Sequence, residues 1–256
     1  MKMAMTMHRR VDAETLDGLD ESDPAAIRSR SDLQRIHRLM GTRRILTRAL
    51  KPILALPDSE VGRPLRLLEL GAGDGSLMLG VARALKQLQL PVHLTLLDRQ
   101  ELVSRETITA FADAGWQTTT RISDVFDWAA GEQQRARDID SPRSWDLIVC
   151  NLFLHHFKAG ALQSLLATIA SCARVFLACE PHRGRLALAA SHMVGLIGAN
   201  AVTRNDAVLS VHAGFCDTEL SRLWPGRSAQ WTCKEYSAGL FSHCLCCQRL
   251  APAPHL

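Results

Sequence analysis

A glycine-rich segment in the first half of the chain has the residue types and spacing of a ligand-binding turn. Residues 67–76 read LLELGAGDGS: an apolar run contains Glu69, three glycines alternate with other residues, and an amphipathic run begins at Leu77. This order predicts a buried strand, a tight turn and a helix N-terminus, which is the layout of a nucleotide-binding βα unit. Glycine permits positive φ in such a turn and lets a ligand lie against bare backbone.

The acidic residues around this turn indicate which ligand it would hold. Asp74 lies within the turn and Glu69 at the end of the strand, so a phosphate would meet carboxylates as well as the amide donors of a helix N-terminus. A dinucleotide is disfavoured for this reason, and because Ser76 stands where the dinucleotide fingerprint has Gly or Ala. A cationic nucleoside without phosphate fits better. S-adenosyl-L-methionine, with its sulfonium and ammonium groups, has that chemistry.

With these residues the sequence resembles the class I S-adenosylmethionine-dependent methyltransferases of small-molecule type, whose first motif E-x-G-x-G-x-G matches residues 69–75. The resemblance extends over residues 65–249. It implies an α/β fold: a Rossmann-like, seven-stranded, mainly parallel sheet with helices on both faces and an antiparallel last strand. The family's second signature is an acid at the end of strand two, which Asp98 supplies after VHLTLL. A carboxylate there can accept hydrogen bonds from both ribose hydroxyls.

Two further signatures follow in the family's order. Asp124, after strand three, would lie near the adenine amino group with Val125 against the ring, and Asn151 ends the buried strand WDLIVCN. Taken alone, Asp98 could cap a helix starting near Glu101, and Asp124 could be a turn residue; the joint pattern carries the inference. The cofactor-binding residues that the resemblance implies are Glu69, Gly71, Ala72, Gly73, Asp74, Gly75, Asp98, Arg99, Asp124, Val125 and Asn151.

Length and composition bound the alternatives. With 256 residues, 47% of them hydrophobic, the chain can bury a core as a single α/β domain. The net charge of +4 is too mild to argue for a nucleic-acid partner. The least polar long stretch, residues 186–202, is too short and too interrupted to span a membrane. The start of the chain lacks the apolar stretch of a signal peptide, so we expect a cytoplasmic protein whose eight cysteines are reduced.

The chain divides into three parts. Residues 1–27 are acidic and poor in apolar residues, so we expect a mobile segment. Residues 28–60 have apolar residues at helical spacing, broken at Gly41, and predict an N-terminal helical extension that caps the core. Residues 61–250 form the methyltransferase core, with an acceptor-covering insertion at about 181–215 that the resemblance implies.

Within the core, strand and helix patterns alternate, which predicts a mainly parallel sheet. The expected strands lie near 65–70, 92–97, 117–122, 145–150 and 173–179, and the expected helices near 76–89, 100–114 and 159–171. Residues 229–236 and 240–249 predict an antiparallel hairpin, and the charged stretch 131–143 predicts a surface loop. The cysteine-rich run 243–247 lacks the second clip of a zinc site, so we expect apolar packing there and no metal.

Two segments outside the cofactor-binding core are expected to hold the acceptor. One is the basic stretch 28–51; the other is residues 180–185 after strand five, at the edge where open α/β sheets bind ligands. An apolar lining suits a small phenolic or polyketide-like hydroxyl acceptor better than a nucleic-acid strand. Methylation of RNA or protein is the alternative, which salt-dependent binding of polyanions by the basic stretch would support. A non-catalytic cofactor-binding scaffold subunit is the third hypothesis.

A hydroxyl acceptor that must lose a proton needs a base. His155 and His156, just after strand four, are the candidate catalytic residues, and His182 is the next candidate. As neighbours, His155 and His156 should point in different directions, so that only one faces the transferred methyl group. Asn151 is followed by Leu-Phe-Leu and not by the Pro-Pro-aromatic sequence of many amino-group methyltransferases, which lowers the odds of amine methylation.

Overall fold

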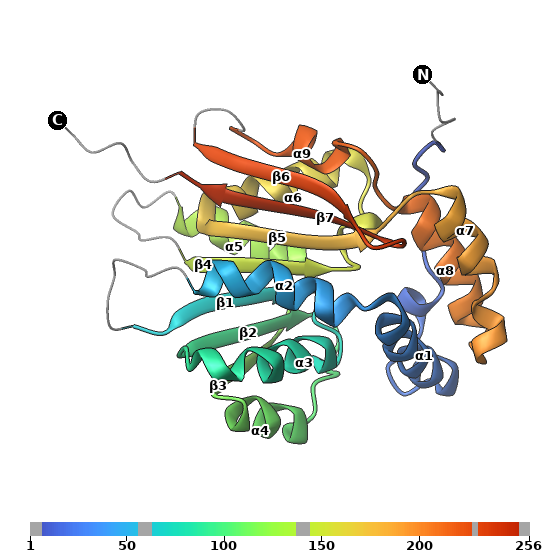
Figure 1. Cartoon of the computed structure of the whole chain (residues 1–256), viewed down its shortest axis with the longest axis horizontal. Coiled ribbons are helices and arrows are strands. Elements are labelled where there is room, and N and C mark those ends of the chain that lie inside the picture. Colours follow the sequence, from blue (N-terminus) through green and yellow to red (C-terminus); the bar gives the residue numbers. More distant parts are fainter. Residues whose placement is uncertain (1–6, 56–62, 137–143, 227–229, 251–256) are drawn as a thin grey trace.

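A seven-stranded sheet forms the centre of the computed structural model, which describes residues 7–55, 63–136, 144–226 and 230–250. The strand order is β3-β2-β1-β4-β5-β7-β6, in which β1 to β5 are parallel and β7 is antiparallel to both of its neighbours (Figure 1). The strands are β1 (Leu65–Leu70), β2 (Val92–Asp98), β3 (Trp116–Ile122), β4 (Trp145–Asn151), β5 (Ala173–Pro181), β6 (Trp231–Ala238) and β7 (Ser242–Arg249). The expected Rossmann-like sheet with its antiparallel last strand is confirmed.

Helices cover both faces of the sheet because successive strand residues point to opposite sides. On β1, Leu67 packs into the core that also holds side chains of α2, α3 and α4, whereas Leu68 packs into the core shared with α5 and α6. The α-helices are α1 (Pro24–Met40), α2 (Thr42–Leu54), α3 (Ser76–Leu85), α4 (Arg105–Asp113), α5 (Val125–Arg135), α6 (Ala159–Cys172), α7 (Arg185–His192), α8 (Ala201–Ala213) and α9 (Glu219–Leu223). The 3-10 helices are η1 (Leu16–Gly18), η2 (Lys86–Leu88), η3 (Leu154–His156) and η4 (Val194–Ile197).

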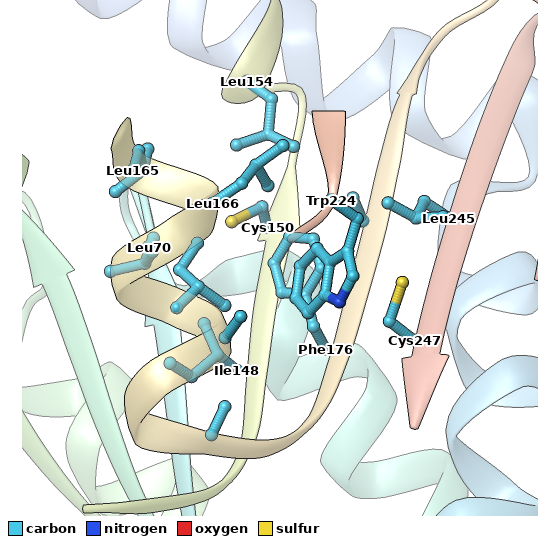
Figure 2. Packing of buried hydrophobic residues seen from close by; sticks show 14 of the residues in the cluster. Leu70, Ile148, Cys150, Leu154, Leu165, Leu166, Phe176, Trp224, Leu245 and Cys247 are labelled. Carbon is cyan, nitrogen blue, oxygen red and sulfur yellow. The ribbon is translucent and has the colours of Figure 1, made fainter. Parts of the chain in front are cut away.

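The core on the α6 side combines leucines with stacked aromatic rings (Figure 2). The rings of Phe176 on β5 and Trp224 after α9 stack with their centroids 5.1 Å apart. Leu165 and Leu166 of α6 are fully buried in the same cluster, so this helix packs directly against β4 and β5. This packing holds the end of β4 in place, and so determines where the loop after Asn151 begins.

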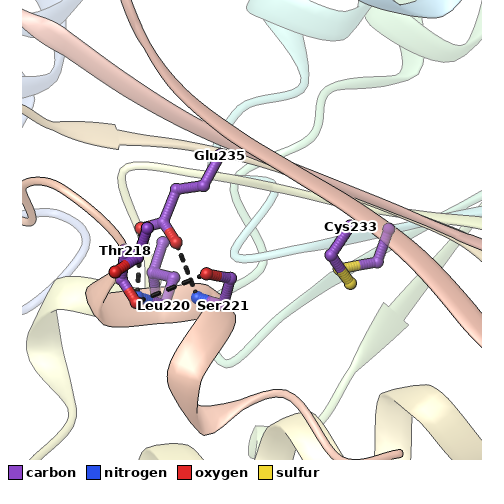
Figure 3. Close-up of a disulfide and its surroundings, with 6 residues drawn as sticks. Thr218, Leu220, Ser221, Cys233 and Glu235 are labelled. Carbon is purple, nitrogen blue, oxygen red and sulfur yellow. Dashed lines mark hydrogen bonds between the residues drawn. A yellow bond between two sulfur atoms is a disulfide. The ribbon is translucent and has the colours of Figure 1, made fainter. Parts of the chain in front are cut away.

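The C-terminal hairpin carries a feature that the sequence predicts wrongly. Cys233 on β6 and Cys247 on β7 are directly opposite partners and form a disulfide, whereas the sequence analysis expected reduced thiols throughout (Figure 3). Cys244 packs into the opposite core from Cys247, as strand alternation requires. The reason for the error is register: a cross-strand pair depends on which residues of the hairpin face one another.

Helix α5 is a second departure from the sequence-based expectation. Residues 131–135 belong to this helix, so the predicted surface loop over 131–143 is wrong for that part; residues 137–143 lie outside the described ranges. Asp124 caps the helix by accepting the main-chain N–H of Phe126 at 2.7 Å. Trp128 and Glu132, one turn apart, are both buried against the core. This burial explains why the helix continues through the charged residues near its end.

The N-terminal extension folds as two helices meeting at Gly41, whose φ of 70° ends α1 in a left-handed cap, as its sequence predicts. Asp23 starts α1 by accepting the Ala25 N–H at 2.7 Å, which places the helix start a few residues before the expected boundary. Helices α1, α7 and α8 gather at one end of the sheet (Figure 1). Within the described ranges, no helix is long and apolar enough to cross a bilayer.

The disulfide predicts a definite thiol count. Alkylation in denaturant without reductant should modify six of the eight cysteines, and alkylation after reduction should modify all eight. Intact-mass spectrometry reads both numbers. In the Cys233→Ser variant all seven remaining thiols should react without reduction. Eight modified cysteines in the unreduced wild-type protein would contradict the pairing of Cys233 with Cys247.

Candidate active site

A cavity of about 310 Å³ lies at the carboxyl ends of the parallel strands. Its walls are the loops that follow β1, β2, β3 and β4, together with α1 and residues 14–17 of the N-terminal segment. Ten of the eleven cofactor residues that the sequence predicts line this cavity, and so do both candidate histidines, His155 and His156. The ten are Glu69, Gly71, Ala72, Gly73, Asp74, Asp98, Arg99, Asp124, Val125 and Asn151.

The glycine-rich turn places the backbone of Gly73 against the cavity. Its φ is 56°, and a Cβ added there would meet nothing within 4 Å, so the open space beside it is the cavity itself. Gly75, the eleventh predicted residue, does not line the cavity. It begins α3 with φ of 72°, and a Cβ there would lie 3.0 Å from Leu96, so this glycine serves close packing of helix on strand.

Asp98 ends β2 and fixes the glycine-rich turn. Its Oδ2 accepts the Gly73 N–H at 2.8 Å, and its Oδ1 accepts the Gln100 N–H at 3.1 Å. The residue therefore does not cap α4, which starts later and is capped by Ser104. Each carboxylate oxygen can accept more than one hydrogen bond, so Asp98 can still receive donors from the cavity.

Two buried acceptors face the same cavity without a partner. Glu69 Oε2 and Asn151 Oδ1 make no hydrogen bond with any residue of the described ranges. Burial, followed by the nearby charges of Asp98 and Asp74, raises the pKa of Glu69 to about 8. Buried acceptors are costly unless a donor reaches them. An ammonium group would satisfy both oxygens and favour the ionised form of Glu69.

Asp124 and Asp74 each hold a wall of the cavity in place. Asp124 caps α5 and lines the cavity beside Val125. Asp74 accepts the Gln34 side-chain amide of α1 at 2.6 Å and the Ser76 N–H at 3.0 Å, so it links the N-terminal helix to the glycine-rich turn. The predicted acids are thus brought together at one site, where they also make structural contacts.

His155 is buried between two carboxylates. Its Nδ1 is 2.8 Å from Glu180 Oε2 and its Nε2 is 3.3 Å from Glu14 Oε1. Burial alone would lower the pKa of His155, but these hydrogen bonds and charges raise it to about 9. Ser210 also donates to Glu14. At neutral pH His155 is therefore an imidazolium that holds two segments together, and it has no lone pair to accept a proton.

His156 lines the same cavity, and its ring centroid lies 4.2 Å from that of His155, so the expectation that the two side chains point in different directions is wrong. The two rings differ in their partners. The Nδ1 of His156 is 3.1 Å from Asp17 Oδ2, and its side chain is partly exposed in the cavity wall. Burial would raise the pKa of Asp17, but the hydrogen bond and charge of His156 lower it. A carboxylate on Nδ1 leaves Nε2 as the acceptor, which is the arrangement of a histidine base.

His37 of α1 also lines the cavity. Its Nε2 is buried and has no hydrogen-bond partner among the described residues. Burial lowers the pKa of His37 to about 4, although the charge of Asp74 opposes the shift. The imidazole is neutral, yet its site disfavours the protonated form that a base must pass through.

The N-terminal segment crosses the cavity and supplies residues that sequence reasoning missed. We call residues 9–19 the N-terminal strap. Arg9 donates to the carbonyl oxygens of Ala213, His155 and Phe157 at 2.7, 3.2 and 3.0 Å. Asp206 accepts the N–H groups of Thr15 and Leu16, both at 2.9 Å. The strap places Glu14 and Asp17 in the cavity wall. Their three-residue spacing was the one sign of a functional role in a segment that was expected to be mobile.

The side chains of Glu14, His155 and His156 bring ligand atoms within 4.8 Å of one another. Two histidines and a carboxylate can hold a divalent cation. In this structure both ring nitrogens of His155 already face carboxylates, and His156 faces Asp17. The cluster is accounted for by these hydrogen bonds.

Comparison with known proteins identifies the fold. The plantazolicin methyltransferase BpumL, solved in complex with SAH, superposes with a TM-score of 0.60 at 14% identity, over 89% of this chain and 91% of that one. A putative O-methyltransferase from Nostoc punctiforme gives 0.53 at 11% identity, over 94% and 64%. The chain has the fold of class I methyltransferases. No protein-family model matches the sequence, and no curated protein matches it.

This methyltransferase fold contains a pH-sensitive contact at His155. Because its pKa lies above the ordinary value of about 6.5, charged His155 stabilises the fold fully below that pH, and the stabilisation is lost as pH rises through about 9. His155→Gln should lower the free energy of unfolding by roughly 1–3 kcal/mol near pH 6, and by progressively less up to about pH 9.5. Urea unfolding across this range measures the difference.

His93→Gln is the matched control, because His93 is exposed on β2. Its unfolding free energy should follow the wild-type curve at every pH. A loss for His155→Gln that stays constant across the whole pH range would show that the imidazole acts through packing and not through its charge.

Proposed function

We propose that this protein is an S-adenosyl-L-methionine-dependent methyltransferase acting on a small hydroxyl acceptor of phenolic or polyketide-like character. The observation that carries the proposal is the pair of unpartnered buried acceptors, Glu69 Oε2 and Asn151 Oδ1, beneath a glycine-rich turn in a methyltransferase fold. The cavity lining among the described residues includes six acidic side chains against two arginines and the charged His155, a balance that favours a cationic ligand.

Different residues of the cavity would bind different parts of the cofactor. Glu69 and Asn151 would bind the ammonium group, because their free oxygens need donors. Asp98 would accept from the ribose hydroxyls, and Asp124 from the adenine amino group with Val125 against the ring. The open backbone at Gly73 would allow close approach, and Ala72 and Arg99 complete this wall. When bound, the cofactor supplies a methyl group on a sulfonium, ready for in-line displacement.

The protein's part in the transfer is to align the acceptor and to take its proton. His156 is the base in this proposal: Nε2 receives the hydroxyl proton, and Asp17 on Nδ1 stabilises the imidazolium that forms. His155 cannot take this part, since it is already charged and enclosed. Leu16, Leu33 and Phe157 give the acceptor an apolar surround, which suits an aromatic or polyketide-like molecule.

Removing the acid at the end of β2 tests cofactor binding. Asp98→Ala should weaken S-adenosylmethionine binding about 10- to 100-fold, because each charged hydrogen bond contributes roughly 1.5–3 kcal/mol and the Gly73 contact is lost as well. Isothermal titration at fixed pH measures the affinity. Asp113→Ala, at the exposed end of α4, is the control and should bind like the wild type. If Asp98→Ala bound within about twofold of the wild type, the cavity would not be the cofactor site.

Removing the imidazole tests the base. His156→Gln should reduce turnover on a phenolic acceptor by about 10²–10⁴-fold while cofactor affinity stays nearly unchanged. Asp17→Asn should act in the same direction with a smaller effect. The pH dependence of the rate should change in His156→Gln, because the base is gone. Single-turnover kinetics with saturating cofactor gives the rates.

His182→Gln is the control for this experiment, since His182 lies outside the residues that line the cavity. Dialysis against EDTA should leave turnover unchanged if the cluster at His155 and His156 works through protons and not through a metal ion. Near-normal turnover and an unchanged pH profile in His156→Gln would remove it as the base. Cofactor binding without turnover on a broad panel of hydroxyl acceptors would favour the scaffold hypothesis.

A further inference from the structure

One end of the molecule exposes apolar side chains that the proposed function does not use. Ten large apolar side chains are exposed in the described ranges, and six of them belong to α1, α7 and the residues up to η4. We call four of these the apolar tip: Leu186, Met193, Leu196 and Ile197. Leu196 is 79% exposed, which is more than any other large apolar residue described. Exposed apolar groups gathered in this way mark a binding surface.

Three arginines lie beside the segment that carries the apolar tip. Arg28 of α1 donates to the carbonyl of Gly198 at 3.4 Å, Arg35 lies beside the same glycine, and Arg204 packs beside Gly195. The sequence from residue 181 to 205 contains no Asp or Glu. Helix α1 carries four arginines and a single acid, Asp32, which is buried and paired with Arg35. This end of the molecule is therefore both apolar and cationic.

The same end borders the proposed acceptor side of the cavity. Leu33 and His37 on one side of α1 line the cavity, whereas Ile27 and Arg28 on another side of this helix belong to the exposed end. Figure 1 shows α1, α7 and α8 together there, beyond the sheet. A surface bound to this end would lie next to the cavity wall against which an apolar acceptor would bind.

We infer that this end docks onto an anionic lipid bilayer. The apolar tip would enter the boundary between headgroups and acyl chains, while Arg28 and Arg204 face the lipid phosphates. Charge complementarity supports an anionic partner, and the tip requires one that also offers an apolar phase, as a bilayer does. An RNA strand would leave Leu196 in water, and the tip offers no aromatic side chain for stacking bases. The inference rests on the surface and not on methyl transfer.

Vesicle co-sedimentation of the full chain tests this. Vesicles of mixed phosphatidylglycerol and phosphatidylcholine should bind the protein at least about tenfold more strongly than phosphatidylcholine alone. Leu196→Asp should weaken binding to the anionic vesicles by about tenfold, because the apolar insertion is lost. Arg28→Glu combined with Arg204→Glu should weaken it by about tenfold or more, since both charges are reversed.

Two matched variants control for charge and folding. Leu240→Asp changes a 63% exposed leucine in the turn between β6 and β7, and Arg83→Glu reverses an exposed charge on α3; both should bind vesicles like the wild type. Thermal unfolding confirms that every variant is folded. Equal binding to both vesicle types, or no effect of Leu196→Asp, would overturn the inference. Salt-sensitive binding of oligouridylate that Arg28→Glu abolishes and Leu196→Asp leaves intact would instead assign the surface to polyanions.

Discussion

The buried carboxylate of Glu180 is the contact on which the architecture of the site depends. It is fully enclosed at the end of β5, and it accepts the N–H groups of Phe153, Leu154 and His155 at 3.1, 2.9 and 3.3 Å. The His155 ring adds a fourth bond at 2.8 Å. A buried charge is tolerated only with such a set of donors, so the turn after β4 has one available conformation. That conformation holds the His155 ring on Glu180 and places the His156 ring beside it in the cavity wall.

The same contact reaches the N-terminal strap. Glu180 orients His155, whose ring binds Glu14 and whose carbonyl accepts from Arg9, so charged groups hold the strap to two distant parts of the chain. Few apolar side chains take part. This explains how a segment with an acidic, apolar-poor sequence can close a cavity: polar contacts in a low-dielectric site replace hydrophobic burial.

Charge is divided between the two sides of the N-terminal helices. Carboxylates collect around the cavity, whereas Arg28 of α1 and Arg204 of α8 lie beside the segment of the apolar tip. The first arrangement suits a cationic cofactor, and the second suits an anionic surface. Helix α1 is the boundary, since Gln34 reaches inward to Asp74 while Arg28 reaches outward to Gly198. One helix thus links the proposed chemistry to the proposed docking surface.

The sequence by itself determined the sheet and the acids at its edge. The glycine-rich turn, Glu69 and Asp98 are local patterns of strand, turn and helix, and parallel strands necessarily bring their carboxyl ends to one edge. Only the tertiary structure decided that Glu14 and Asp17 complete the cavity and that Cys233 pairs with Cys247. The physical reason is that these contacts join segments that meet only once the chain has folded. Glu14 and His155 are separated by 141 positions, and neither leaves a periodic signal that points to the other.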